Sequence, residues 1–210
     1  TEICEDMWFA DQPSKHLTAA GAEIIVNPSA SPELVAKSAY RKELVRMTSA
    51  VQRAAYVYAG ADWTESTTDI VMSGHAIIAE NGSVLAERTP FTTDERLMVA
   101  DIDIEHLRHD RLQDTTYAEK STATTIVETS IKRTQPDCIR RVPTSYFLPA
   151  YETSAERTAR LERILAIQAH GFAARLKAVG SQTIVLGLSG GLDSTLALLV
   201  ARRAVAILGK

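Results

Sequence analysis

The sequence has few cysteines, little excess charge and no long uninterrupted apolar run. Two cysteines in 210 residues, Cys4 and Cys138, are too few for a disulfide framework. A net charge of −3 without a basic stripe argues against binding to nucleic acid and against attraction to a membrane surface. The apolar stretch at 196–208 contains Arg202 and Arg203 and is too short to span a bilayer, so it indicates a helix of a packed core.

The first residues also lack the features of a secretory leader. Residues 1–6 have neither a basic start nor an apolar centre, so we expect a cytoplasmic protein. The composition is that of a globular protein: 45% of the residues are hydrophobic, and 210 residues are enough for one large or two small cores.

Short β-favouring runs and helical patterns alternate over the first two-thirds of the chain, which predicts a mixed α/β domain. Asn81-Gly82 stands between two alternating runs, at 75–80 and 83–87, and predicts a hairpin with a type I′ turn. Further elements are expected as strands at 23–27, 56–59 and 97–102, a helix over 34–55, and a polar helix at 105–113 with Asp103 as its N-cap. The apolar face of the long helix would consist of Leu34, Ala39, Leu44, Met47 and Val51.

The pattern changes at about residue 132. Pro136, Pro143 and Pro149 interrupt a stretch without periodicity, which is typical of a linker. Thr153 and Glu156 then form a capping box that starts a new helix. The apolar face of that helix would consist of Leu161, Ile164, Leu165, Phe172 and Leu176. We therefore predict a first domain at 1–131, a linker at 132–153 and a second domain at 154–210.

The second domain would hold only a helix, a strand at 183–188 and a final helix. A parallel sheet of one strand cannot bury both of its faces. We therefore expect the sequence to be a piece of a longer protein.

The segment SGGLDS at 189–194 lies between the expected strand and the final helix, and it is suited to bind phosphates. Glycines allow backbone N–H groups to approach an anion, and the N-terminus of the following helix favours negative charge. The expected ATP-binding residues are Gly187, Ser189, Gly190, Gly191, Asp193 and Ser194, with Asp193 also a candidate ligand for Mg²⁺. A Walker A lysine and the spacing of a dinucleotide site are both missing. The loop instead resembles the pyrophosphate loop of the N-type ATP pyrophosphatases.

Further motifs extend this resemblance over the whole chain. They are EICEDMW at 2–8, NPSAS at 27–31, ESTTD at 65–69 and GHAIIAENG at 74–82, followed by SGGLDS. In this order they are similar to the nitrilase-like glutaminase domain and the following synthetase domain of the glutamine-dependent NAD⁺ synthetases. The implied fold is the C-terminal part of a nitrilase-like α-β-β-α layered sandwich, followed by the first α-β-α unit of a Rossmann-like ATP pyrophosphatase domain.

The resemblance also implies roles for residues. Cys4 would attack the side-chain amide of glutamine and form a thioester. Glu5 would bind the α-amino group, Trp8 would form a wall of the pocket, and Ser31 and Lys37 would bind the α-carboxylate. Ammonia would then amidate deamido-NAD⁺ while ATP is converted to AMP and pyrophosphate with Mg²⁺, which makes the parent enzyme a ligase and, as in the family, a homo-oligomer.

Two features of the family's glutaminase site have no counterpart in the sequence. The family's catalytic glutamate and lysine precede the cysteine, and only Thr1, Glu2 and Ile3 precede Cys4 here. Glu2 does not inherit the role of the base, because in the family that glutamate comes from a different strand. We expect the isolated chain to be inactive.

Two other interpretations remain open. The chain could belong to another glutamine amidotransferase of the pyrophosphatase class, or it could be an ATP-binding module without catalysis. The acceptor substrate, and the release of pyrophosphate, would distinguish them.

Two polar clusters are weaker candidates. His106 and His109 with Asp110 have a spacing that could bind zinc, but their charged neighbours indicate an exposed helix face. Asp101 and Asp103 resemble a carboxylate pair, for which helix capping by Asp103 is the stronger interpretation.

Overall fold

The computed structural model describes the chain except for residues 94–96, 116, 118–123, 131–137, 141–152 and 210. It divides the chain into two compact units, Thr1–Arg141 and Val142–Lys210. The predicted linker at 132–153 lies almost wholly outside the described residues. No helix in the described ranges is long and apolar enough to cross a membrane.

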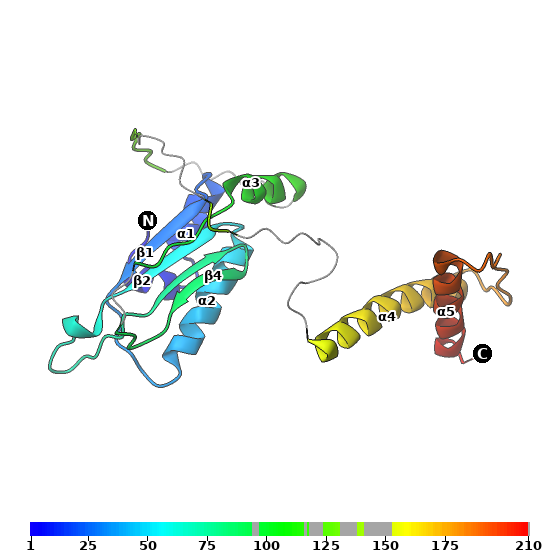
Figure 1. Cartoon of the computed structure of the whole chain (residues 1–210). Helices are drawn as coiled ribbons and strands as arrows, with labels where there is room; N and C mark the ends of the chain where they lie inside the picture. Colours follow the sequence, from blue (N-terminus) through cyan, green and yellow to red (C-terminus); the bar gives the residue numbers. More distant parts are fainter. Residues whose placement is uncertain (94–96, 116, 118–123, 131–137, 141–152, 210) are drawn as a thin grey trace. The chain divides into compact units, whose positions relative to one another are not determined.

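A four-stranded mixed sheet forms the centre of the first unit (Figure 1). Its strands are β1 (Ile24–Ser29), β2 (Ala55–Gly60), β3 (Ala76–Glu80) and β4 (Ser83–Arg88), in that spatial order. β1 and β2 are parallel, whereas β3 is antiparallel both to β2 and to β4. The parallel pair requires a crossover, which the helix α2 (Lys37–Val51) supplies.

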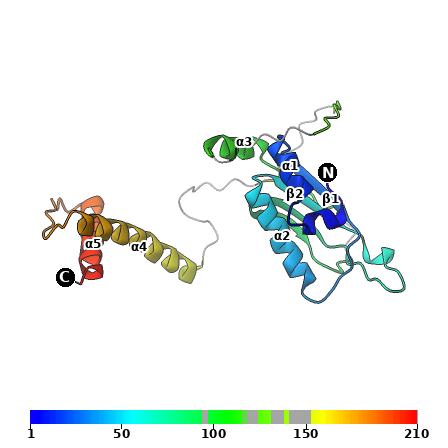
Figure 2. The ribbon, with the colours of Figure 1, turned by 180° about the vertical axis from the view of Figure 1, so that it is seen from behind.

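One face of this sheet is covered by helices. Figure 2 shows α1 (Pro13–Ala19) and α2 in front of the strands. Together with the short 3₁₀ helix η1 (Cys4–Trp8), they bury a core of Met7, Ile25, Val45, Tyr56, Tyr58, Ile77 and Ala79. β1 alternates strictly, so Ile25 and Asn27 face this core, whereas Ile24 and Val26 on the other face are 42% and 40% exposed. The strand predicted at 23–27 is therefore present, but only half of it is buried.

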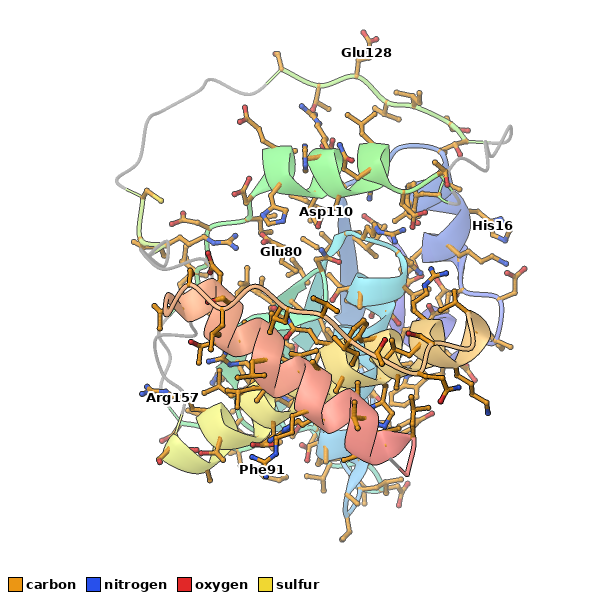
Figure 3. All side chains as sticks on the ribbon, turned by 90° about the vertical axis from the view of Figure 1, so that its right-hand side faces the viewer. His16, Glu80, Phe91, Asp110, Glu128 and Arg157 are labelled. Atoms are coloured by element: carbon orange, nitrogen blue, oxygen red, sulfur yellow. The ribbon has the colours of Figure 1, made fainter. Side chains whose placement is uncertain are left out.

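The hairpin prediction is confirmed. Asn81 and Gly82 both have positive φ, of 44° and 84°, as a type I′ turn requires. The helix α3 (Ile104–Gln113) is joined to this turn, because Asn81 Nδ2 donates to Asp110 Oδ2 at 2.6 Å and the N–H of Asp103 donates to Glu80 Oε2 at 2.7 Å. The acceptors of these two hydrogen bonds, Asp110 and Glu80, are labelled in Figure 3. Asp103 also caps α3, as expected, by accepting from the N–H of His106 at 2.9 Å.

Two predictions for the first unit are wrong. The segment 97–102 forms no strand, because it pairs with none of the four strands. The predicted apolar face of α2 is correct only at Leu44, which packs against the core: Leu34 precedes the helix, and Ala39, Met47 and Val51 are exposed. The buried positions are Arg41, Val45, Thr48 and Ser49. Three of these residues are polar, so apolar periodicity does not predict their burial.

The second unit consists of two described helices, α4 (Ser154–Ala178) and α5 (Leu192–Ile207). The capping box of α4 is confirmed, since the Thr153 side chain accepts from the N–H of Glu156 and Glu156 accepts from the N–H of Thr153. Small buried residues, Ala169, Ala173, Ala201 and Ala204, let the two helices approach closely. On the predicted apolar face of α4, Leu161 and Ile164 are exposed, so that face is displaced toward these alanines.

The predicted strand at 183–188 is not formed. The segment has no hydrogen-bonded partner strand among the described residues, and a strand requires one. The Rossmann-like α-β-α unit expected here is therefore not confirmed.

Candidate active site around Cys4

Cys4 stands at the point where an extended segment beside β1 turns into η1. The N–H of Glu2 donates to the carbonyl of Val26 at 3.1 Å, which aligns the first residues with the strand. At Cys4 the backbone then takes a φ of 50°. A left-handed conformation in a residue with a Cβ costs on the order of 1–2 kcal/mol, so the surrounding contacts must hold it.

Asn27 supplies contacts on both sides of the Cys4 residue. Its Oδ1 accepts from the N–H of Cys4 at 3.1 Å, and its Nδ2 lies 3.5 Å from the carbonyl oxygen of Cys4. The same Nδ2 donates to the hydroxyl of Tyr56 at 3.1 Å. Asn27 is on the core side of β1 and is fully buried.

The Glu2 side chain accepts two hydrogen bonds. The Tyr56 hydroxyl donates to Glu2 Oε1, and the N–H of Ser14, at the start of α1, donates to Glu2 Oε2 at 2.8 Å. Burial raises the pKa of the Tyr56 hydroxyl, and the bond to Glu2 raises it further, so Tyr56 keeps its proton. Both oxygens of the Glu2 carboxylate thus accept hydrogen bonds within the core, from Tyr56 and from Ser14.

A cavity of about 400 Å³ opens beside Cys4. It is lined by Cys4, Glu5, Trp8, Ala30, Ser31, Pro32 and Lys37. The structure therefore brings together, in one cavity, Cys4 and the four residues that the sequence analysis placed around it. They come from η1, from the loop after β1 and from the first residue of α2.

Lys37 is held at the rim of this cavity. Its Nζ donates to the carbonyl of Pro32 at 2.9 Å and lies 5.5 Å from the centroid of the Trp8 ring. Trp8 in turn stacks on Tyr40 with ring centroids 5.6 Å apart. Burial lowers the pKa of Lys37, and the nearby charge of Arg41 lowers it further. A carboxylate in the cavity would offset both effects, because it would give the ammonium a counter-charge.

A buried set of charges supports the loop that carries Ser31. Arg41 Nη1 donates to Glu33 Oε2 at 3.0 Å and lies 2.9 Å from His75 Nδ1. Glu33 Oε2 also accepts from Ser73 at 2.7 Å. Burial alone would raise the pKa of Glu33, but the hydrogen bonds from Ser73 and Arg41 outweigh it and the pKa is lowered. No local pattern in the sequence indicates this set, because its members come from separate elements.

The loop at 189–194 is described in the second unit. Gly190 has a φ of 83°, and α5 begins two residues later with Asp193 in its first turn. The hydroxyls of Ser189 and Ser194 are 3.2 Å apart, so both lie on one side of the loop. Gly187 to Asp193 are all exposed.

This geometry fits a phosphate group, since exposed backbone N–H groups and a helix N-terminus are the elements of a phosphate cradle. A single carboxylate, Asp193, also fits Mg²⁺ bound mainly through phosphate oxygens.

The other metal candidates are not supported. Over the described ranges, no three His, Cys, Asp or Glu side chains could hold a metal ion. His106 pairs with Asp110 at 3.3 Å on the exposed face of α3. Asp101 accepts from the N–H of Ile139 at 2.5 Å and of Arg140 at 2.6 Å, which is a structural role.

Comparison with known proteins identifies the first unit. The family model described as carbon-nitrogen hydrolase matches residues 1–111. The chain belongs to the carbon-nitrogen hydrolase family. The cavity beside Cys4 is the candidate active site of this family member.

Several relatives carry a more specific name. The glutamine-dependent NAD(+) synthetase of Mycobacterium bovis is 38% identical over 213 residues, which cover 97% of this chain and 31% of that protein. That of Aquifex aeolicus is 27% identical over 209 residues, covering 99% of this chain and 34% of that protein. A solved glutamine-dependent NAD⁺ synthetase from Acinetobacter baumannii in complex with ADP matches with a TM-score of 0.44 and 22% identity, covering 97% of this chain and 30% of that one. The chain thus spans about a third of the length of the curated relatives it matches.

Proposed function

We propose that this chain forms part of a glutamine-dependent NAD⁺ synthetase and contains its glutaminase nucleophile and its pyrophosphate loop. The observation that carries the proposal is the cavity in which Cys4, Glu5, Trp8, Ser31 and Lys37 come together. It is supported by relatives of that name along 97% of the chain.

In the glutaminase reaction, the Cys4 thiolate attacks the side-chain amide carbon of glutamine. The amide nitrogen takes up a proton and leaves as ammonia, and water then hydrolyses the thioester to glutamate. Glu5 and Lys37 provide one anion and one cation for the zwitterionic head group of glutamine, with Ser31 as a further donor to the α-carboxylate. The base and the lysine of the family's sites would lie outside these 210 residues.

In the synthetase reaction, ATP bound at 189–194 adenylates the nicotinate carboxylate of deamido-NAD⁺ and releases pyrophosphate. Ammonia then displaces AMP and gives NAD⁺. Mg²⁺, held by Asp193 and the phosphates, would offset their negative charge. An internal route for ammonia is expected, because ammonium ion formed in solution at neutral pH is not a nucleophile.

The test uses the product of the complete reading frame that contains this sequence. AMP formation is measured with ATP and ammonia, with either deamido-NAD⁺ or xanthylate as acceptor. Turnover with deamido-NAD⁺ alone supports the proposal. Turnover with xanthylate alone assigns the chain to another amidotransferase of this class, and ATP binding without release of pyrophosphate indicates a non-catalytic nucleotide-binding module.

A further inference from the structure

The backbone at Cys4 needs an external support, and the structure shows where the support comes from. With φ at 50°, Cys4 is one of the few residues other than glycine that adopt a left-handed conformation in the described part of the chain. Its N–H is bound by the side chain of Asn27 and not by the backbone of a regular element. The direction in which the Cys4 side chain leaves the chain therefore depends on one buried amide.

An asparagine amide can occupy its site in two orientations, and only one of them can hold Cys4. The N–H of Cys4 requires the oxygen Oδ1, so that Nδ2 must face the Tyr56 hydroxyl. If the amide were turned over, Nδ2 would face the N–H of Cys4, and two donors would meet. A buried contact of that kind costs the desolvation of both groups.

The hydrogen bonds of the Tyr56 hydroxyl select the correct orientation of the Asn27 amide. The Tyr56 hydroxyl donates to Glu2, so only its lone pairs remain for Asn27. Glu2 can only accept at this position, and it is itself fixed by the N–H of Ser14 at the start of α1. The hydrogen bonds therefore all donate in one direction, from the N–H of Cys4 to Asn27, from Asn27 to Tyr56 and from Tyr56 to Glu2.

We propose that Asn27 is a positioning residue for the Cys4 nucleophile, and that Tyr56 and Glu2 fix the orientation of its amide. The inference rests on the proposed glutaminase function for its catalytic consequence. Asn27 also engages the N–H of Cys4, so this N–H is not available to stabilise an oxyanion, and donors for the oxyanion come from other groups. None of these three residues lines the cavity, so they act on the rate through Cys4 and not through contact with glutamine.

The experiment compares four variants of the product of the complete reading frame: Asn27→Leu, Tyr56→Phe, the double variant, and Ser49→Ala. Ser49 is the matched control, because it is fully buried and hydrogen-bonded, to Arg46 and Gly82, but lies apart from this series. We expect Asn27→Leu to lower kcat for glutamine about 100-fold, which is typical of a displaced reacting group, with KM changed less than about threefold. Ammonia-dependent synthesis should not change.

The thiol itself gives a second measurement. Cys138 is exposed and unbridged, so its alkylation by iodoacetamide is an internal reference for that of Cys4. Asn27→Leu should lower the ratio of the Cys4 rate to the Cys138 rate about tenfold, and Tyr56→Phe should lower it by a smaller factor. Because the two residues act in series, the double variant should be no slower than Asn27→Leu. Ser49→Ala should leave kcat and the ratio unchanged.

Each outcome supports or contradicts the positioning role of Asn27. If folded Asn27→Leu keeps kcat and the alkylation ratio within twofold of the parent, the proposal is wrong. If Asn27→Leu does not fold, Tyr56→Phe alone decides by the same two measurements. If the parent hydrolyses no glutamine but the alkylation ratio still depends on Asn27, the proposed function fails while the positioning role stands.

Discussion

Arg41 on α2 and Glu33 on the loop after β1 form an ion pair of 3.0 Å, in which the arginine side chain is 1% exposed. The pair connects the helix that carries Lys37 with the loop that carries Ser31. Tyr58 lies against the guanidinium group, 5.4 Å from ring centroid to Arg41 Cζ. The two segments that contribute Ser31 and Lys37 to the cavity beside Cys4 are therefore joined by one buried pair of charges.

Removing the arginine from this pair should be strongly destabilising. Arg41→Met leaves Glu33 buried without its cation, and breaking such a pair costs about 3–5 kcal/mol. Chemical denaturation of the purified protein measures the loss. Arg46→Met is the control, because Arg46 forms a 2.8 Å pair with Glu43 on the exposed side of the same helix. That change should cost about 1 kcal/mol or less, and equal effects of the two substitutions would contradict the prediction.

The same cluster predicts a loss of stability on mild acidification. Burial lowers the pKa of His75 below its ordinary value of 6.5, against the opposing effect of the hydrogen bond to Glu87. The unfolded chain therefore binds a proton at a higher pH than the folded one, and stability falls as the pH decreases through 6.5. Glu33 does not contribute until the pH approaches its ordinary value of 4.5.

The variant His75→Gln distinguishes the contribution of His75 to the pH dependence of stability from that of other titratable groups. The difference in unfolding free energy between pH 7.5 and 5.5 should be smaller in His75→Gln than in the parent. Urea denaturation at the two pH values measures it. An unchanged difference would mean that His75 takes up its proton without cost in the folded protein.

The parts of this structure that sequence analysis predicted correctly depend on residues close together in the chain. The turn at Asn81-Gly82, the cap at Asp103 and the capping box at Thr153 are each defined within four residues, so their physical cause is visible in the sequence. The strands predicted at 97–102 and 183–188 had the right composition but pair with no strand in the described part of the chain. Pairing is a long-range property that composition does not contain.

The candidate site shows the same difference between local contacts, which the sequence predicts, and long-range contacts, which it does not. Glu5 and Trp8 follow Cys4 directly, and the sequence placed them together. Asn27 and Tyr56 could not be found in this way, because the contact of Asn27 with Cys4 arises from the extended segment beside β1, and that of Tyr56 with Asn27 from the pairing of β1 with β2. Arg41 was missed for another reason: a buried cation on a helix resembles a solvent-exposed one until its partners from other elements are known.

Lys37 should determine the affinity for glutamine more than the rate of its hydrolysis. Lys37→Met removes the cation proposed for the α-carboxylate, and a charge-assisted hydrogen bond of about 1.5–3 kcal/mol corresponds to a rise in KM of about 10- to 100-fold. kcat should change little, because the contact is the same in the ground state and the transition state.

Lys42→Met provides the control for this change. Lys42 is also on α2, but its Nζ donates to Glu87 at 2.6 Å and it does not line the cavity. Steady-state kinetics with glutamine should therefore show a normal KM for Lys42→Met. A fall in kcat for Lys37→Met at unchanged KM would place Lys37 in the chemistry and not in binding.

Gly190→Ala should separate the two proposed reactions. Gly190 has a φ of 83°, which an alanine adopts only with strain, and an added methyl group would stand where a phosphate must approach the backbone. Loss of one hydrogen bond to a charged phosphate, of about 1.5–3 kcal/mol, predicts ammonia-dependent AMP formation reduced about 10- to 100-fold. Glutamine hydrolysis at Cys4 should continue, because Cys4 belongs to the other unit.

Two further variants make this test specific. Gly180→Ala imposes a comparable backbone strain, since Gly180 has a φ of 62° and, like Gly190, has no atom within 4 Å of an added Cβ. It lies outside the loop, so its synthetase activity should be normal, and an equal loss in both variants would show strain and not phosphate binding as the cause. Cys4→Ala should give the opposite pattern to Gly190→Ala: glutamine hydrolysis is lost, whereas synthesis from free ammonia continues because the proposed ATP-binding loop at 189–194 is intact.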